Sequence, residues 1–256
     1  MADKREFGIG LIGLGIGQQH LLGYQRQNLR VAAICDKDTT RLNEIGNTFG
    51  VEKRYTRIAD LIADTDVDVV DMAVQPWIRS PIVKAAAEAG KHILCQKPFS
   101  MSMQQAVEMV NISERHNVQL MVNQNSCFVP GFLAIEPYIN AEHLGEIYHV
   151  SITCNGFYTE FPERHLIPAM QVHHIGLIHK WFGEYESVTV KHTDITAQLR
   201  KEKPFPSRFS KVGTVYRVCF RVTGHSLPIP DATYSTRTRK SASKARKGLS
   251  TETVMT

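Results

Sequence analysis

The residues with the clearest chemical potential lie near the N-terminus of the chain. An apolar run from Phe7 to Ile12 ends in three closely spaced glycines, and a strand that turns sharply into a helix in this way places the pyrophosphate of a dinucleotide on the helix N-terminus. The next apolar run, Val31–Cys35, is followed by an aspartate at the distance where an acidic side chain receives ribose hydroxyls. The residues predicted to bind a dinucleotide here are Gly13, Gly15, Ile16, Gly17 and Asp36.

The register of this glycine-rich turn has to be chosen between two alternatives. The pattern G-x-G-x-x-G is matched literally from Gly8 to Gly13, but the apolar residues between those glycines are typical of a strand interior, where no tight turn forms. A register that starts at Gly13 has Gln18 in the third glycine position, with Gly17 one residue early. We prefer it because only this register puts Asp36 at the end of the next strand; the remaining alternative is a glycine-rich turn without a ligand.

A lysine after the fourth apolar run is the second candidate. Residues 92–99 read HILCQKPF, so a short strand delivers Lys97 to the carboxyl edge of the sheet, where its charge can hold a substrate hydroxyl and tune the acidity of that hydroxyl. A lysine before a proline is usually a solvated loop residue, and only its location makes Lys97 a candidate. Gln75 and Pro76 follow the apolar run that ends at Val74, and together with Lys97 they are expected to contribute to cofactor binding at the same edge.

A parallel sheet is needed to bring these turns together. Apolar runs alternate with helical patterns as far as Val122, which predicts an α/β fold with a Rossmann-type, doubly wound parallel sheet and helices on both faces. The expected strands are Phe7–Ile12, Val31–Cys35, Val67–Val74, His92–Cys95 and Gln119–Val122. The expected helices are Gln18–Gln27, Thr39–Phe49, Ile58–Ala63, Ser80–Ala89 and Ser102–His116.

The second half of the chain contains a helix with two adjacent histidines. At helical spacing, His174 shares an apolar arc with Leu177 and Ile178 and is expected to be a core histidine with a local hydrogen bond. His173 points away from that core, either into a cleft or into water. Strands are expected around this helix at Ile147–Cys154, Ser187–Thr196 and Val212–Val222.

Composition and charge exclude several classes of protein. The chain has 256 residues and a formal net charge of +5, all of which residues 233–256 account for, so no basic face for nucleic acid is expected on the folded body. No apolar run is long enough for a membrane span and the start of the chain does not resemble a signal peptide, so we expect a cytoplasmic protein that does not bind membranes. The five cysteines lack the spacing of a disulfide framework or a metal site.

The chain divides by composition into three parts. Residues 1–122 are expected to form a dinucleotide-binding domain and residues 123–232 a second domain, which the family resemblance described below implies to be a partial substrate and oligomerisation domain. Residues 233–256 are rich in Ser, Thr, Lys and Arg and lack periodic apolar positions, which predicts a disordered basic tail.

The motifs together resemble the glucose-fructose oxidoreductase / inositol dehydrogenase (Gfo/Idh/MocA) family. The resemblance is carried by the glycine turn with Asp36, by VQPWIRSPIVKAAAEAGKHILCQKPFS and by VHHIGLIHKWFGE, and extends from Phe7 to about residue 225. It implies that an α/β domain with a mainly antiparallel sheet follows the dinucleotide-binding domain. It also implies hydride transfer between NAD(P) and a sugar, polyol or related compound, and a homo-oligomer formed through the second-domain sheet.

The resemblance also assigns roles to individual residues. Lys97 matches the family's catalytic lysine, although Gln96 stands where a Glu usually precedes it. His173 matches the catalytic histidine, the general acid/base toward the reacting hydroxyl, and Asn155 occupies a place that often lines the sugar site. Lys97, His173 and Asn155 are thus the expected substrate-binding residues.

The cofactor preference follows from the residues after the second strand. Asp36 matches the acid typical of members that prefer NAD, while Lys37 and Arg41 leave room for a phosphate and keep NADP possible. No metal is expected.

Departures from the family pattern support a second hypothesis. Ala169 and Gly176 stand where the family commonly has aspartates on either side of the histidine, and these would orient His173 and stabilise its charged form. The family-like sequence ends near Gly224, as it would after an early stop or a shifted reading frame. The alternative is therefore a nucleotide-binding protein without turnover, or a degenerate, truncated relative.

Overall fold

The computed structural model describes residues 7–140, 150–156, 171–183, 185–194, 214–222 and 250–255. The chain divides into two compact units, Met1–Gln124 and Asn125–Thr256.

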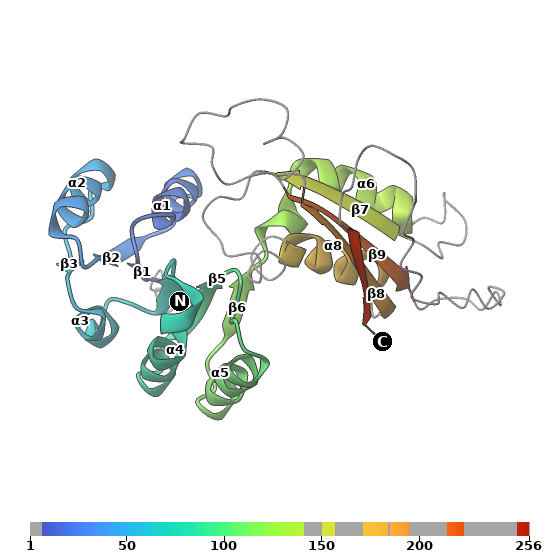
Figure 1. Ribbon diagram of the computed structural model, residues 1–256. Coiled ribbons are helices and arrows are strands. Elements are labelled where there is room, and N and C mark those ends of the chain that lie inside the picture. The colour runs from blue at the N-terminus through green and yellow to red at the C-terminus, as the bar shows by residue number, and fades with distance from the viewer. Residues whose placement is uncertain are drawn as a thin grey trace, which may run out of the picture. The chain divides into compact units, whose positions relative to one another are not determined.

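The first unit is built on a parallel sheet of six strands in the order β3-β2-β1-β4-β5-β6 (Figure 1). This is the doubly wound Rossmann order, in which the direction of winding reverses between β1 and β4 and ligands bind at the carboxyl ends of the strands. The strands are β1 (Ile9–Ile12), β2 (Val31–Cys35), β3 (Arg54–Tyr55), β4 (Val69–Met72), β5 (His92–Gln96) and β6 (Leu120–Asn123). The helices are α1 (Gly17–Arg26), α2 (Thr39–Phe49), α3 (Ile58–Ala63), η1 (Pro76–Ile78), α4 (Arg79–Glu88) and α5 (Met103–Arg115).

Two hydrophobic clusters hold the helices on opposite faces of this sheet. Successive strand residues point to opposite faces, and accordingly Ile12 belongs to the cluster under α3, α4 and α5 while Leu11 belongs to the cluster under α1 and α2. Figure 1 shows the same division, with α1 and α2 on one side of the sheet and α3, α4 and α5 on the other. The sheet is therefore buried on both faces, and its carboxyl edge is left for polar turns.

The predicted doubly wound parallel sheet is confirmed, and three of its elements have the predicted bounds. These are β2, α2 and α3, and the other predicted strands and helices of this unit differ by one or two residues at their ends. The sequence did not predict β3 or η1, since an element of two or three residues is too short to show a periodicity.

The second unit contains an antiparallel sheet of four strands in the order β10-β8-β9-β7. Its elements are η2 (Asn125–Phe128), α6 (Pro130–Asn140), β7 (Val150–Gly156), α8 (Val172–Phe182), β8 (Tyr185–Asp194), β9 (Thr214–Val222) and β10 (Ser250–Met255). Ile178 of α8 is fully buried, with Val150 and Ile152 of β7 and with Ile175 and Phe182 of its own helix around it.

Two elements of this unit differ from the sequence-based expectations. Residues 250–255 form β10, paired antiparallel with β8, instead of belonging to a disordered tail; STETVM is rich in β-branched residues and has no proline, so it can add to an open strand edge. Helix α6 was not predicted, because Gly131 and Pro137 interrupt its helical pattern. The rest of the expected tail, residues 233–249, lies outside the described residues.

Candidate functional site

The glycine turn lies between β1 and α1, and the absence of a side chain has a different consequence at each of its three glycines. Gly13 has a φ of +89°, and a Cβ there would meet the carbonyl oxygen of Ala73 at 2.8 Å. A Cβ on Gly17 would lie 3.2 Å from Leu11, so this glycine lets the helix pack closely on the strand. At Gly15 nothing lies within 4 Å of the added Cβ, which leaves open space over an exposed stretch of backbone. These are the three functions that glycines have in a dinucleotide-binding turn, with Gly17 in the packing function.

The N-terminus of α1 is suited to bind an anion. Its N-cap residue, the exposed Ile16, supplies no side-chain hydrogen bond to the first helical turn. The first N–H groups of a helix have no acceptors within the helix, and the helix dipole adds partial positive charge at this end. The turn therefore presents backbone donors and positive potential in a place that a side chain larger than glycine would fill.

Asp36 follows β2 and fastens the glycine turn from the neighbouring strand. Its Oδ2 accepts a hydrogen bond of 2.8 Å from the backbone N–H of Leu14, and its Oδ1 accepts one of 2.9 Å from the N–H of Asp38. Arg41, on α2, lies 3.3 Å from Asp36 Oδ2 and 3.0 Å from Asp38 Oδ2. The buried carboxylate of Asp36 is thus held in place beside the turn, and the guanidinium of Arg41 is already paired with two carboxylates.

Lys97 lies at the same edge, directly after β5. Its side chain is half-buried, and burial together with the nearby charge of Arg79 lowers the pKa of its ammonium group from the ordinary value of 10.5. Gln75, which is exposed, and Pro76, which is buried and opens η1, follow β4 at this edge. A lysine with a lowered pKa is better able to exchange a proton near neutral pH than an ordinary surface lysine.

Arg79, which the sequence did not single out, ties two of these turns together. It is only 1% exposed, and its guanidinium donates to the carbonyl oxygens of Val74 after β4, of Gln96 at the end of β5 and of Pro98 just beyond it. Burial lowers the pKa of this guanidinium, yet an arginine remains charged in proteins. Arg79 therefore both shapes the turn that carries Lys97 and places a positive charge near it.

A buried polar network also adjoins this edge. Asp71 of β4 is fully buried under α1, where it accepts hydrogen bonds from Tyr24 Oη at 2.6 Å and meets His20 Nδ1 at 2.7 Å. Burial and the charge of Asp71 raise the pKa of the Tyr24 phenol. The sequence does contain a signal for this network, because Asp71 is a single acid in an otherwise apolar strand and His20 and Tyr24 are polar residues four positions apart on α1. None of the three is predicted as a site residue from the sequence.

The second unit holds the other two predicted site residues. His173 lies in the first turn of α8 and is half-buried, and its carbonyl oxygen accepts a hydrogen bond of 3.0 Å from Ser126 Oγ. Asn155 lies in β7. His174 makes the predicted local hydrogen bond, with its Nδ1 3.0 Å from Gln171 Oε1, but it is half-buried instead of lying in the core; burial lowers its pKa.

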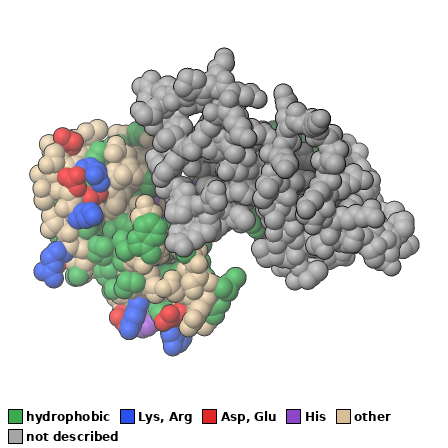
Figure 2. Space-filling model, viewed as in Figure 1, with side chains coloured by type: hydrophobic (Ala, Val, Ile, Leu, Met, Phe, Trp, Pro, Cys, Tyr) green, Lys and Arg blue, Asp and Glu red, His purple; other side chains and the backbone are tan. Residues whose placement is uncertain are grey.

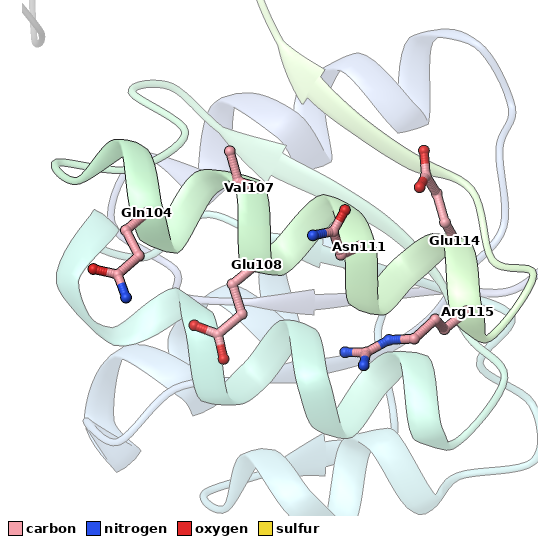
Figure 3. A pocket seen from close by; sticks show the side chains of 6 residues that line it. All are labelled: Gln104, Val107, Glu108, Asn111, Glu114 and Arg115. Atoms are coloured by element: carbon pink, nitrogen blue, oxygen red, sulfur yellow. The ribbon is translucent and has the colours of Figure 1, made fainter.

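The pocket drawn in Figure 3 is not part of this edge. Its lining side chains all come from the exposed face of α5, opposite the buried Met109 and Ile112. It is a surface depression that contains no buried polar group, and we assign it no role. The six lining residues are Gln104, Val107, Glu108, Asn111, Glu114 and Arg115.

The surface of the first unit carries charges of both signs. On the face that Figure 2 shows, Lys and Arg side chains lie near Asp and Glu side chains, and Lys53 pairs with Asp64 and Asp66. Among the described residues, no three His, Cys, Asp or Glu side chains gather in a way that could hold a metal ion. None of the described helices combines the length and apolar character needed to cross a membrane.

Comparison with known proteins matches most of the first unit to the model of a known protein family. Residues 7–124 match the model of an oxidoreductase family with an NAD-binding Rossmann fold, GFO_IDH_MocA. The chain is also similar to a solved structure of an NAD binding oxidoreductase from Klebsiella pneumoniae, with a TM-score of 0.65 and 26% identity over 74% of this chain and 56% of that one.

Two curated relatives extend the similarity beyond the family model. D-apiose dehydrogenase of Rhizobium rhizogenes is 28% identical over 180 residues, 67% of this chain and 52% of the relative. Myo-inositol 2-dehydrogenase of Thermotoga maritima is 32% identical over 152 residues, 57% of this chain and 44% of the relative. The chain thus spans about half the length of the curated relatives that it matches.

Proposed function

We propose, from the match of residues 7–124 to the NAD-binding Rossmann model of the Gfo/Idh/MocA oxidoreductase family, that the chain is a member of this family and transfers a hydride between NAD and a sugar, polyol or related hydroxyl compound. The observation that carries the proposal is the carboxyl edge of the first sheet. An uncapped helix N-terminus, a buried carboxylate and a lysine of lowered pKa follow three of its strands.

The residues present at this edge fit a dinucleotide. The open space over Gly15 and the backbone N–H groups at the start of α1 are suited to the pyrophosphate. Asp36 is oriented by the N–H groups of Leu14 and Asp38, and its carboxylate can accept hydrogen bonds from the ribose hydroxyls. Gln75 and Pro76 follow β4 at the same edge of the sheet.

The same residues favour NAD over NADP. A 2′-phosphate would lie beside the carboxylate of Asp36, and Arg41, the nearest guanidinium, is already paired with Asp36 and Asp38. Lys37 is exposed and offers a single flexible charge. We therefore expect the chain to bind NADP more weakly than NAD.

The chemistry that the cofactor supplies is the hydride transfer itself, and the chain has to position the reacting carbon and handle the hydroxyl proton. Lys97 would hold the reacting hydroxyl and stabilise negative charge on its oxygen, and His173 would remove or return the proton. Asn155 would bind another hydroxyl of the substrate. The roles of His173 and Asn155, and the pairing of copies through the second sheet, depend on the resemblance and stay predictions.

A specific observation keeps the non-catalytic alternative as a second candidate. Gly176 lies one turn after His173 in α8, so this position supplies no carboxylate to orient the imidazole. Ala169 lies outside the described residues. A protein that binds the nucleotide without turnover would use the first unit in the same way.

Calorimetric titration with NAD and NADP, followed by a screen of polyols and aldoses for reduced cofactor, tests the proposal. We expect NAD to bind, turnover with at least one substrate, and a loss of turnover by about a hundredfold or more in Lys97→Met with little change in NAD affinity. NAD binding without turnover across the panel would favour the second candidate. If no dinucleotide bound, the assignment of Gly15 and Asp36 would be wrong.

A further inference from the structure

The backbone N–H of Lys97 is held by the side chain that precedes it. This N–H donates a hydrogen bond of 2.7 Å to Oε1 of Gln96, whose side chain is buried. A backbone N–H can only donate, so the atom that it meets must be the amide oxygen of Gln96. The orientation of this amide is thereby determined, and its Nε2 group points the other way as a donor.

The amide nitrogen of Gln96 meets an imidazole. Gln96 Nε2 lies 3.1 Å from His20 Nε2, and the amide nitrogen of Asn123 at the end of β6 lies 3.5 Å from the same atom. Because Gln96 donates, His20 Nε2 must accept and therefore carries no proton. The other ring nitrogen, Nδ1, lies 2.7 Å from the buried carboxylate of Asp71 and must be the protonated one.

A directed chain of hydrogen bonds thus runs from the Lys97 turn into the protein interior. Lys97 N–H donates to Gln96, Gln96 donates to His20, and His20 donates to Asp71, which also accepts from Tyr24. The groups that contact the His20 ring are Asp71, Gln96 and Asn123, and Tyr24 bonds the same oxygen of Asp71. Among these described contacts of the ring, Asp71 supplies the only charge.

We propose that Gln96 and His20 are positioning residues that hold the Lys97 turn, and that they do so with His20 as a neutral imidazole protonated at Nδ1. A second proton, at Nε2, would set two donors against each other and break the contact with Gln96. The importance of the Lys97 turn rests on the proposed function, whereas the tautomer and the hydrogen-bond chain do not.

The amide at position 96 determines this protonation state. In Gln96→Glu a carboxylate would still accept from Lys97 N–H, but its second oxygen would face His20 Nε2 as an acceptor. His20 would then lie between two carboxylates, and its doubly protonated form would be favoured. The one-atom change from amide nitrogen to oxygen is therefore expected to switch His20 from neutral to charged while the shape of the site is preserved.

The test is long-range proton–nitrogen NMR of the histidine side chains in the full chain at neutral pH, with the His20 signals identified by their absence in His20→Asn. We expect His20 to carry its proton on Nδ1 alone in the native chain and protons on both nitrogens in Gln96→Glu. An Nε2-protonated or doubly protonated His20 in the native chain, or an unchanged ring in Gln96→Glu, would overturn the proposal.

Hydrogen exchange at the Lys97 amide tests the positioning role. We expect Gln96→Leu to speed this exchange by about five- to tenfold, the factor for one lost hydrogen bond, and His20→Asn to speed it by a smaller factor. His116→Asn, the same change at an exposed histidine after α5, is the control and should leave it unchanged. If His20→Asn behaved like the control, the chain of bonds would not support Lys97.

The functional readout separates this inference from the proposed function. With the proposed substrate reaction, His20→Asn should lower kcat with NAD affinity unchanged. If NAD failed to bind while the tautomer and the exchange rates came out as expected, the proposed function would fail and the positioning network would stand.

Discussion

At the scale of single residues, side chains at the carboxyl edge of the first sheet hold the backbone of the turns around them. Asp36 is the clearest case, because it holds the N–H of Leu14 in the glycine turn while its position after β2 is that of a ribose-binding acid. The turn and the acid are therefore one structural feature, and the register that includes Asp36 begins at the turn between β1 and α1.

Alanine substitutions at two glycines of the turn should affect stability and NAD binding separately. Gly13→Ala forces an alanine to a φ of +89° and its Cβ to 2.8 Å from Ala73 O, so we expect a loss of about 1–3 kcal/mol of unfolding free energy. Gly15→Ala meets no neighbour and should leave the melting temperature unchanged while it weakens NAD binding by about tenfold or more. Thermal melts and calorimetry measure the two effects; the reverse pattern would contradict the register.

The lowered pKa of Lys97 predicts the alkaline side of the pH profile. The ammonium form predominates below its pKa, which burial and Arg79 set below 10.5, so kcat/KM should fall with rising pH before an ordinary lysine would titrate. Lys97→Arg keeps its proton throughout, and whatever activity this variant retains should not show that decline. A decline that persists in Lys97→Arg would assign it to another group.

At the scale of elements, helix α2 shows how the ends of a helix can carry their own sequence signals. Helix α2 begins after Asp38, whose side chain accepts from the N–H groups of Thr40 and Arg41, and ends at Gly50 with a φ of 66°. Both features are readable without a structure. Helix α4 shows the opposite case, because no side chain caps its start and its first residue, Arg79, is buried in contacts with remote carbonyl groups.

Replacement of Arg79 tests how far this helix end supports the site. Arg79→Met would leave the carbonyl groups of Val74, Gln96 and Pro98 without their donor, and we expect a loss of about 3 kcal/mol or more of unfolding free energy. Lys84→Met, on the exposed side of the same helix, should change it by no more than about 0.5 kcal/mol. Denaturant melts compare the two; equal effects would show that the buried guanidinium is dispensable.

At the scale of the whole molecule, each hydrophobic cluster lies within one unit. Both clusters that cover the six-stranded sheet are made of residues before Gln124, and the cluster around Ile178 belongs to the second unit. A body with its own core is expected to fold alone. The predicted boundary after residue 122 remains a proposal that can be tested directly.

A fragment of residues 1–124 should therefore melt cooperatively and bind NAD within a factor of about three of the full chain, because all the proposed cofactor-binding residues lie in it. It should show no turnover, since His173 is absent. Circular dichroism and calorimetry measure folding and binding. A non-cooperative melt would show that the first unit needs the second.

The sequence by itself determined the alternation of strands and helices, the position of the glycine turn with Asp36, and the location of Lys97, because these depend on local periodicity, on turn chemistry and on the rule that parallel strands end at one edge. It did not reveal the functions of Arg79, His20 and Asp71. The contacts of Arg79 with Gln96, of His20 with Asp71 and of His20 with Gln96 join residues 17, 51 and 76 positions apart in the chain. A buried charge or a tautomer depends on which groups the fold brings together. The strand at residues 250–255 also depends on the tertiary structure, since this polar segment becomes a strand by pairing with the edge of β8.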